Sequence, residues 1–429
     1  MIPSLPEVNR SVRIAETGPW LQRLAGFLGP GCLVAVGYMD PGNWATDLAG
    51  GSAYGYSLLW IVALSSLAAM LLQALAVRLG VATGMDLAQV CRASYSARAT
   101  RWYWLSCEIA ICATDLAEVI GTAIGLQLLF GIPLVWGVPL TALDVLVILW
   151  LQQRSFRYVE AVVTALILVV GVCFALNLLL TQLHWQALGR GLLPHADILS
   201  DPNKLYLAVG IIGATVMPHN LYLHSSIVQT RRYRRDRQGK RSALQFASVD
   251  TVGALSLAFV VNAGLLVLAA AVLHAAGHHD VIGIQQTYRL LAPVLGAGAA
   301  VLFGLALIAS GQASALSATL AGQVVMEGLL NWRIAPWARR LLTRAIALLP
   351  AFAVAVCLGE HGIARLLILS QAILSLQLPF AIVPLIRFTS DPRRMGALVS
   401  PRWLRLAGWS TAAIIMALNG VLLVQFVGR

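Results

Sequence analysis

The sequence has 429 residues, of which 59% are hydrophobic and only 11% are charged. Soluble domains carry about 25% charged residues, so the composition excludes a soluble globular protein and predicts a polytopic, all-α membrane protein. The net charge of +12 does not indicate nucleic-acid binding, because the cations gather on one side of the predicted membrane spans.

Long apolar runs predict eleven transmembrane helices, since about 20 apolar residues are needed to cross a bilayer. The runs fall near residues 25–50, 55–77, 103–129, 132–151, 158–181, 204–228, 249–273, 293–323, 341–358, 365–386 and 404–427. The first 21 residues are polar and show no cleavable signal peptide. We therefore expect a cytoplasmic N-terminal segment at 1–24.

The distribution of Lys and Arg predicts the orientation of the chain. If the N-terminus is cytoplasmic, only five of the 30 Lys and Arg lie in outside segments, namely Arg190, Lys204, Arg289, Arg365 and Arg429. This bias follows the positive-inside rule and places the C-terminus outside. The densest basic run, 231–241, is interpreted as a topology determinant facing anionic lipid rather than as a nucleic-acid site.

The first span is interrupted in its middle by Asp40-Pro41-Gly42-Asn43. Proline lacks the N–H that a helix needs, and glycine favours irregular backbone. An ionisable residue at a helix break inside a membrane is expensive and indicates a functional site. Capping of the broken helix by Asp40 is a structural alternative that is compatible with binding.

The third span carries three carboxylic acids, Glu108, Asp115 and Glu118. At about 100° per residue they share one face of the helix, which must look at protein or water rather than lipid. Each acid could simply pair with an arginine or a hydroxyl. The alternative is a proton or cation path, because buried carboxyl groups can hold protons near neutral pH. Asp144 in the fourth span is uninformative by itself.

The sixth span repeats the anomaly of the first, because Met217-Pro218-His219-Asn220 interrupts it. Interrupted hydrophobic segments at corresponding places in two halves mark the binding site of many transporters. The two groups of five spans start on opposite sides of the membrane. The sequence thus predicts an inverted repeat of 25–181 and 203–390, with an additional peripheral helix at 404–427.

Other polar residues in or near the spans leave alternatives open. The outer-loop residues His274, His278, His279 and Asp280 form either a metal pre-binding cluster or a group of ordinary surface histidines. Gln371 and Gln377 in the tenth span serve as helix–helix contacts or as cation ligands.

Three arginines open the ninth span. We interpret Arg339 as a topology determinant at the membrane surface. Arg344 lies about one turn deeper than Arg340 and is expected to enter the protein interior.

The two breaks together offer a mixed set of donor atoms. Asp40 and Asn43 supply oxygen, Pro218 leaves the carbonyl of Ala214 without its helical hydrogen bond, and Met217 supplies a thioether. Oxygen alone suits Mg²⁺ and Ca²⁺, whereas a soft sulfur favours transition metals such as Mn²⁺, Fe²⁺ and Co²⁺.

The paired breaks resemble the signatures of the Nramp family of divalent-metal transporters, and the bacterial manganese transporter branch fits best. The third-span run EIAICATDLAEVIG and the tenth-span run LSQAILSLQLPFA are similar to that family too, in the same order from about Gly29 to Pro384. The resemblance implies a LeuT-type fold and import of Mn²⁺, with Fe²⁺, Co²⁺ or Cd²⁺ as weaker substrates, coupled to or accompanied by H⁺. We expect no bound cofactor, with the metal as substrate and H⁺ as the coupling ion. Short loops and one sequon, Asn9-Arg10-Ser11 on the cytoplasmic side, fit a bacterial inner membrane.

The resemblance also implies roles for particular residues. Asp40, Asn43, Met217 and the Ala214 carbonyl would ligate the metal, joined in some conformations by the Gly37 carbonyl and Gln371. The proton route would be lined by Glu108, Asp115, Glu118 and His219, with Arg340 or Arg344 further along and His224 in a less defined role. Two positions depart from the family pattern, because Gly37 replaces an expected alanine and Asp47 adds a negative charge one turn beyond Asn43.

Two other functions compete with metal transport. A Na⁺-coupled amino-acid or organic-solute transporter of the same fold would carry small or hydroxyl residues at the breaks, not an Asp and a Met. An enzyme would need a nucleophile–base constellation, and Ser225-Ser226 near His224 is too weak a sign of one. We therefore expect a transporter and not an enzyme.

Overall fold

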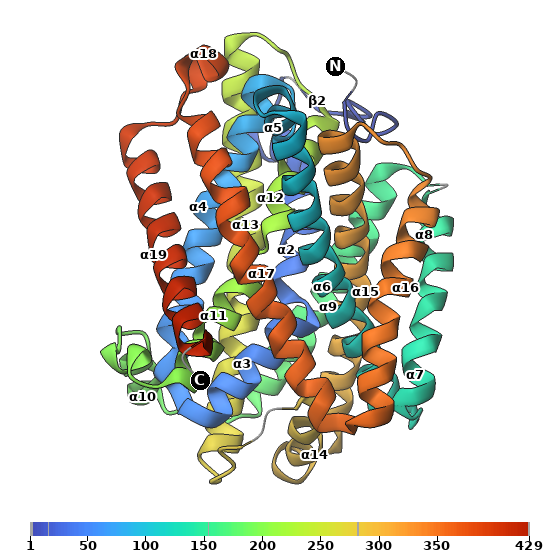
Figure 1. The fold of residues 1–429 in the computed structure, drawn as a ribbon, viewed down its shortest axis with the longest axis vertical. Coiled ribbons are helices and arrows are strands. Elements are labelled where there is room, and N and C mark those ends of the chain that lie inside the picture. Colours follow the sequence, from blue (N-terminus) through green and yellow to red (C-terminus); the bar gives the residue numbers. More distant parts are fainter. Residues whose placement is uncertain (1–2, 16, 153, 281–282, 428–429) are drawn as a thin grey trace.

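The computed structural model describes residues 3–15, 17–152, 154–280 and 283–427 as an almost entirely helical protein (Figure 1). The long helices are α4 (Leu59–Thr83), α6 (Ala97–Phe130), α9 (Phe156–Leu179), α13 (Arg237–Ala269), α15 (Ala297–Val325), α16 (Pro336–Cys357), α17 (Gly359–Thr389) and α19 (Arg402–Val427). The shorter helices are α1 (Trp20–Phe27), α2 (Pro30–Ala35), α3 (Pro41–Tyr54), α5 (Leu87–Ser94), α7 (Leu134–Leu140), α8 (Asp144–Gln152), α10 (Trp185–Gly191), α11 (Pro202–Val216), α12 (Pro218–Ile227), α14 (Ile284–Leu295) and α18 (Pro392–Met395). Two short strands, β1 (Val12–Arg13) and β2 (Arg231–Arg232), pair in parallel.

Within the described ranges, nine helical segments are long and apolar enough to cross a membrane. The first of them, Pro41–Thr83, contains α3 and α4, which are joined by a 3₁₀ turn, η2 (Gly55–Leu58), whose first residue has a φ of 58°. It therefore covers the end of the first predicted span and the whole second one. Two shorter apolar helical segments, Pro30–Met39 and Leu134–Val147, lie outside these nine. The protein is a multi-pass membrane protein by this measure, and the count of eleven spans stays a prediction.

Both predicted helix interruptions are present. The chain runs from α2 through a short 3₁₀ turn, η1 (Gly37–Met39), and becomes extended at Asp40 (φ −68°, ψ 164°) before α3 begins at Pro41. Proline fits this first helical position because its missing N–H is not needed there. In the second case Met217 (φ 10°, ψ 106°) separates α11 from α12, which also begins with proline.

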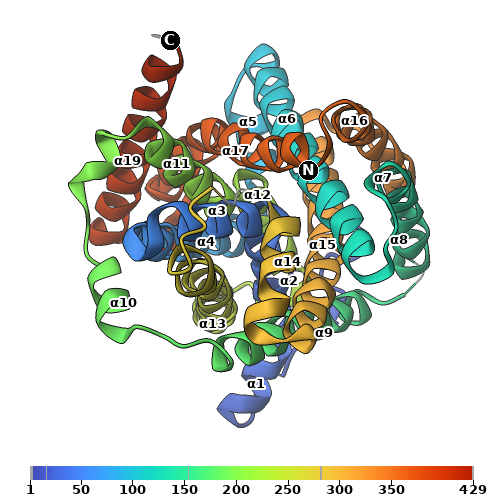
Figure 2. The same ribbon diagram turned by 90° about the horizontal axis from the view of Figure 1, so that it is seen from below.

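The two broken helices lie in the centre of the bundle (Figure 2), and nearly all of their residues are buried. Around them, α15 packs against α6 and α9, α13 against α3 and α4, and α11 against α17. The last helix, α19, contacts α17 and α11 from the edge of the bundle. This position agrees with the prediction of a peripheral final helix.

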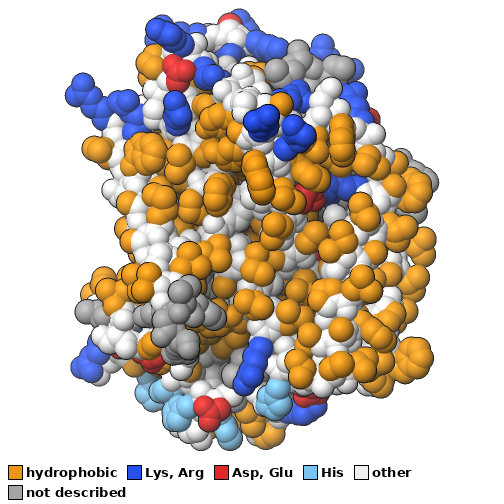
Figure 3. Space-filling view, viewed as in Figure 1, with side chains coloured by type: hydrophobic (Ala, Val, Ile, Leu, Met, Phe, Trp, Pro, Cys, Tyr) orange, Lys and Arg blue, Asp and Glu red, His pale blue; other side chains and the backbone are white. Residues whose placement is uncertain are grey.

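Charge is distributed unevenly along the long axis of the molecule (Figure 3). Lys and Arg gather at the upper end, apolar side chains form a broad band below it, and histidines gather at the lower end. We call the upper end the basic end. It carries β2 and the first turns of α6, α13 and α19, with exposed arginines such as Arg98, Arg101, Arg241 and Arg402.

Candidate metal site and the charge network beside it

The two helix breaks meet through the side chain of Asn43. Its Nδ2 donates hydrogen bonds to Asp40 Oδ1 (2.7 Å) and to the carbonyl oxygen of Ala214 (3.1 Å). Asp40 also caps α3, because its Oδ1 accepts a hydrogen bond from Asn43 N (2.8 Å). The predicted cap and the predicted meeting of the two breaks are therefore both present.

The second carboxylate oxygen of Asp40 is buried and has no hydrogen-bond partner in the described structure. A buried carboxylate oxygen without a partner costs free energy unless a proton or a cation occupies its surroundings. The last turn of α11 points its carbonyl end at the same place, which also favours positive charge. The chemistry of this point thus suits a cation.

Met217 closes the other side of this site. Its sulfur accepts a long contact from Asn220 Nδ2 (3.6 Å) and is fully buried. A Cβ atom built on Gly37 would overlap Asn220 Nδ2 and would lie 3.3 Å from Met217 Sδ. Gly37 is therefore close to the thioether, and the absence of a side chain at residue 37 makes room for the amide of Asn220.

Gln371 of α17 lies directly against the first break. A Cβ atom on Gly42 would overlap its Nε2, and one on Gly213 would overlap its backbone carbonyl. The Oε1 of Gln371 is buried and has no partner in the described structure, while its Nε2 donates to Ser370 Oγ (2.8 Å). Gln371 thus offers its Oε1, which accepts no hydrogen bond in the described structure, beside Asp40 and Asn43. Gln377 instead contacts Cys107 of α6 (3.3 Å) and so joins two helices.

Asn262 of α13 is part of the same arrangement, although the sequence reasoning did not select it. Its Nδ2 donates to the carbonyl of Tyr38 (2.7 Å) and to Asn43 Oδ1 (3.2 Å). It therefore fixes both the 3₁₀ turn before the break and the amide within it. An isolated amide in the apolar run 249–273 was the available signal.

A buried network of charges lies next to this site, between α6, α8 and α16. Arg340 donates to Asp115, to Glu118 Oε2 (3.2 Å) and to Asp144 Oδ2 (3.0 Å). Arg344 donates to Asp144 and to the backbone carbonyl of Asp115 (3.3 Å). Three carboxylates thus face two guanidinium groups, so the network carries one excess negative charge when every group is ionised.

The structure therefore pairs each predicted acid of the third span with a partner. Glu118 also accepts from Ser314 Oγ (3.0 Å), and Glu108 lies two turns away, where it accepts a bidentate hydrogen bond from Arg339 (2.9 and 2.8 Å). The interpretation of Arg339 as a surface topology residue was wrong, because its side chain is only 4% exposed. Arg340 and Arg344 both enter the interior.

The two predicted histidines lie at different places on α12. His219 is buried near the break, and its Nδ1 has no partner in the described structure. His224 lies one turn or more beyond, where its Nδ1 donates to Gln73 Oε1 (2.9 Å), and Gln73 Nε2 donates to Tyr38 Oη (2.7 Å). His224 is therefore connected to the turn before the first break and not to the charge network.

Two further predicted positions lie toward the lower end. Asp47 is buried, and its Oδ2 has no partner in the described structure. Of the outer histidines, His274 Nδ1 donates to the carbonyl of Ser52 (2.8 Å) and contacts His279 Nδ1 (3.1 Å). The described residues contain no group of three His, Cys, Asp or Glu side chains arranged to hold a metal ion, so nothing here supports pre-binding.

Comparison with known sequences identifies the family. Residues 31–425 match the family described as Nramp, natural resistance-associated macrophage protein-like. The chain is 56% identical over 422 residues to the divalent metal cation transporter MntH of Xylella fastidiosa, a match that covers 98% of this chain and 89% of the relative.

Solved structures agree with this result. A manganese transporter of Eremococcus coleocola superposes with a TM-score of 0.90 at 40% sequence identity, covering 97% of this chain and 90% of the other. MhsT in complex with L-phenylalanine gives a TM-score of 0.58 at 15% identity, covering 93% and 97% of the two chains, which shows a shared LeuT-type fold alone. From the extent of the sequence match and the identity to its relatives, the chain belongs to the Nramp family.

Proposed function

We propose that this protein is a secondary active transporter that imports divalent transition metal ions by alternating access. Mn²⁺ is the preferred substrate, Fe²⁺, Co²⁺ and Cd²⁺ are also carried, and H⁺ is coupled to or accompanies the metal. The observation that carries the proposal is the meeting of Asp40, Asn43, the Ala214 carbonyl and Met217 at two facing helix breaks. The names of its relatives as a divalent metal cation transporter and a manganese transporter support it.

The donor atoms suit this substrate. Asp40 Oδ2 supplies a charged oxygen, the carbonyl of Ala214 a neutral one and Met217 a soft sulfur, a combination that favours transition metals over Ca²⁺ and Mg²⁺. The Asn43 amide now presents Nδ2 to Asp40 and Ala214. It would turn its oxygen toward an arriving cation, and the Gly37 carbonyl and Gln371 would join as the surrounding helices move.

The charge network is the proposed route for protons. Asp115 and Glu118 lie on the same helix face, and the network with Arg340, Arg344 and Asp144 has one excess negative charge when fully ionised. One bound proton neutralises it, so the network can take up and release a proton without leaving a buried net charge. The route also includes His219 at the break and Glu108 with Arg339 near the basic end. His224 is assigned to the route as well, and its hydrogen bonds lead through Gln73 to Tyr38 before the first break.

The membrane potential by itself can drive metal entry. Two positive charges moving inward through −100 mV gain about 4.6 kcal/mol, at roughly 2.3 kcal/mol per charge. This corresponds to more than about three decades of accumulation. In this proposal protons neutralise the acids between transport cycles or act as a gate. The membrane potential supplies most of the driving force for metal entry.

The architecture proposed with this function has eleven transmembrane helices. A cytoplasmic segment (1–24) precedes two inverted five-helix repeats (25–181 and 203–390), and a final helix occupies 404–427. The basic end faces the cytoplasm of a bacterial cell, the protein resides in the inner membrane, and the C-terminus is outside. The gathering of Lys and Arg at one end supports this orientation.

A Na⁺-coupled amino-acid or organic-solute transporter of the same fold is the alternative, and it is not favoured. The likeness to MhsT, at 15% identity, concerns the fold alone. A carboxylate and a thioether at the two facing breaks do not match the small or hydroxyl residues expected for such a substrate.

The substitution Met217→Ala tests the proposed substrate class. In proteoliposomes, Mn²⁺ uptake by the parent should persist in excess Ca²⁺, whereas Met217→Ala should lose discrimination against Ca²⁺ by about tenfold or more, the scale on which changes around a metal alter its affinity. Met395→Ala removes a buried methionine of α18 at the basic end and serves as the control. Unchanged selectivity in Met217→Ala would remove the thioether from the site.

A further inference from the structure

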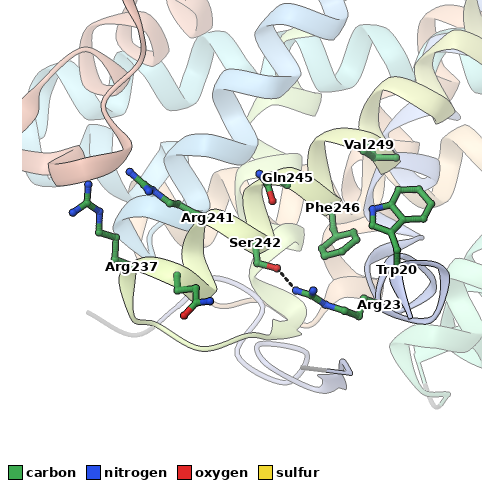
Figure 4. Close-up of a pocket in the computed structure, with 9 residues that line it drawn as sticks. Trp20, Arg23, Arg237, Arg241, Ser242, Gln245, Phe246 and Val249 are labelled. Carbon is green, nitrogen blue, oxygen red and sulfur yellow. Dashed lines mark hydrogen bonds between the residues drawn. The ribbon is translucent and has the colours of Figure 1, made fainter. Parts of the chain in front are cut away.

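A pocket of about 810 Å³ opens at the basic end between α1 and the first turns of α13 (Figure 4). Three arginines line it, Arg23 from α1 and Arg237 and Arg241 from α13, together with Trp20 and Phe246. No Asp or Glu is among the lining residues that the structure describes. None of the described lining residues belongs to the two helix breaks, and the proposed transport mechanism makes no use of the pocket.

The described residues leave two of the pocket's arginines without a carboxylate partner. Arg237 and Arg241 form no ion pair in the part of the chain that the structure describes. The neighbouring carboxylate, Asp236, instead accepts from Arg234 Nη2 (2.6 Å) and caps α13 at Gly239 N (2.9 Å). An anion is therefore the ligand that this surface would attract.

Arg23 is held in place while part of its charge remains available. Its Nη2 donates to Ser242 Oγ (2.6 Å), and its guanidinium carbon lies 4.8 Å from the ring centre of Phe246. Its Nε is buried and has no acceptor in the described structure. The guanidinium of Arg23 is thus fixed against an aromatic ring at the wall of the pocket, where it adds positive charge beside Trp20.

The surroundings place the pocket at the membrane surface. Trp20 is 56% exposed and packs 6.2 Å from Phe246, and exposed tryptophans are enriched at the level of lipid headgroups. Arg237, Arg241 and Val249 line one side of the pocket, and Val249 and Val252 are exposed apolar residues. At 1.5 Å per residue, Val249 is about 12 Å further along the helix than Arg241, so the pocket extends from the basic surface to the apolar band.

We propose that this pocket binds the headgroup phosphate of an anionic glycerophospholipid. The phosphate would lie against Arg237 and Arg241, whose guanidinium groups lie on the same side in Figure 4, while Arg23 and Trp20 would face the glycerol backbone. An acyl chain would run along α13 past Val249. A zwitterionic lipid brings no net negative charge to the three arginines, so the pocket favours lipids with net negative charge. The inference depends on the membrane location of the chain and not on the metal that it carries.

Lipid titration followed by native mass spectrometry tests this site on the purified full-length protein. The parent should bind phosphatidylglycerol in preference to phosphatidylcholine. The variant R237Q/R241Q should lose about fivefold in affinity for phosphatidylglycerol for each arginine removed. The matched control R98Q/R101Q removes two exposed arginines at the same end and should bind as the parent does.

Each other outcome overturns the proposal. Equal losses in the two double variants would mean that the lipid responds only to the general charge of the basic end. Equal binding of phosphatidylcholine would remove the requirement for an anion. Inorganic phosphate that binds as tightly as phosphatidylglycerol would make this a site for a free anion. Thermal unfolding checks the fold of each variant, and Arg23→Gln provides the test if R237Q/R241Q does not fold.

Discussion

Asn43 is the residue on which the proposed metal site depends most directly, through its side-chain amide. It bridges the carboxylate of Asp40 and the carbonyl of Ala214, and so it holds two partially negative groups from different helices together. A bound cation would hold the same two groups together with a stronger attraction. The N–H group of Asn43 thus keeps the two breaks close to the geometry that binding requires, which reduces the reorganisation that a metal must induce.

At this scale Asn262 should control metal affinity without touching the metal. Because it orients the Asn43 amide and the Tyr38 carbonyl, Asn262→Ala should raise the KM for Mn²⁺ by about tenfold or more, as loss of an orienting residue commonly does. Radiotracer or fluorescence uptake in proteoliposomes measures this effect.

Asn177→Ala is the matched control for that experiment, because Asn177 is a buried amide of α9 whose Nδ2 donates to the carbonyl of Cys173 in the same helix (3.0 Å). Its KM should stay near that of the parent. A normal KM in Asn262→Ala would show that Asn43 is oriented by other contacts.

At the scale of elements, three helices are joined by charge rather than by apolar packing alone. α6 supplies Asp115 and Glu118, α16 supplies Arg340 and Arg344, and α8 supplies Asp144. Removing one partner of such a network leaves an unpaired buried charge, whereas adding or removing a proton changes the net charge of the network by one unit. The network is therefore both a constraint on helix position and a place where protons can be held.

Neutralising the acids of α6 should separate the proposed proton flux from metal uptake. Asp115→Asn and Glu118→Gln should lower proton flux more than metal uptake, because the membrane potential already favours metal entry. A pH-sensitive dye inside proteoliposomes and parallel Mn²⁺ uptake give the two rates.

The control for this comparison is Glu360→Gln, since Glu360 pairs with the exposed Arg289 at the opposite end of the molecule and should change neither rate. Equal loss of proton flux and metal uptake in the α6 variants would contradict the proposed proton route.

The elements that the sequence predicted well are those with a local physical cause. Pro41 and Pro218 break their helices through a missing N–H, so both interruptions were predicted at the right residues. Contacts between side chains on different helices have no local cause of this kind. Asp144 and Arg339 could not be placed in pairs, because helix period gives the face of one helix but not the neighbour that this face meets. Asn262 was missed for the same reason.

At the scale of the whole molecule, one end is basic and the middle band is apolar. Short loops rich in Lys and Arg are retained on the cytoplasmic side during membrane insertion. The same charge would attract anionic lipid to that surface once the protein is in place. Orientation and lipid contact therefore follow from one feature of the composition.

Reporter fusions in bacterial cells measure this orientation. Alkaline phosphatase, which is active only outside the cytoplasm, should be inactive when fused after Gly396, in the turn at the basic end, and active when fused after Val427. A fluorescent protein that folds only inside should give the opposite pattern. Activity of the phosphatase at Gly396 would reverse the proposed orientation.

The contact of α17 with the two broken helices has a mechanical consequence. At Gly42 and Gly213 no side chain separates α17 from its neighbours, and Gln371 lies directly against both. Helices that interlock through large side chains must lift apart or repack before they can shift. Because Gly42 and Gly213 have no side chains to interlock with α17, this helix can move along the two breaks while exchanging few interactions. A larger side chain at Gly213 would overlap α17 and would slow the change of open side without altering the proposed donor side chains.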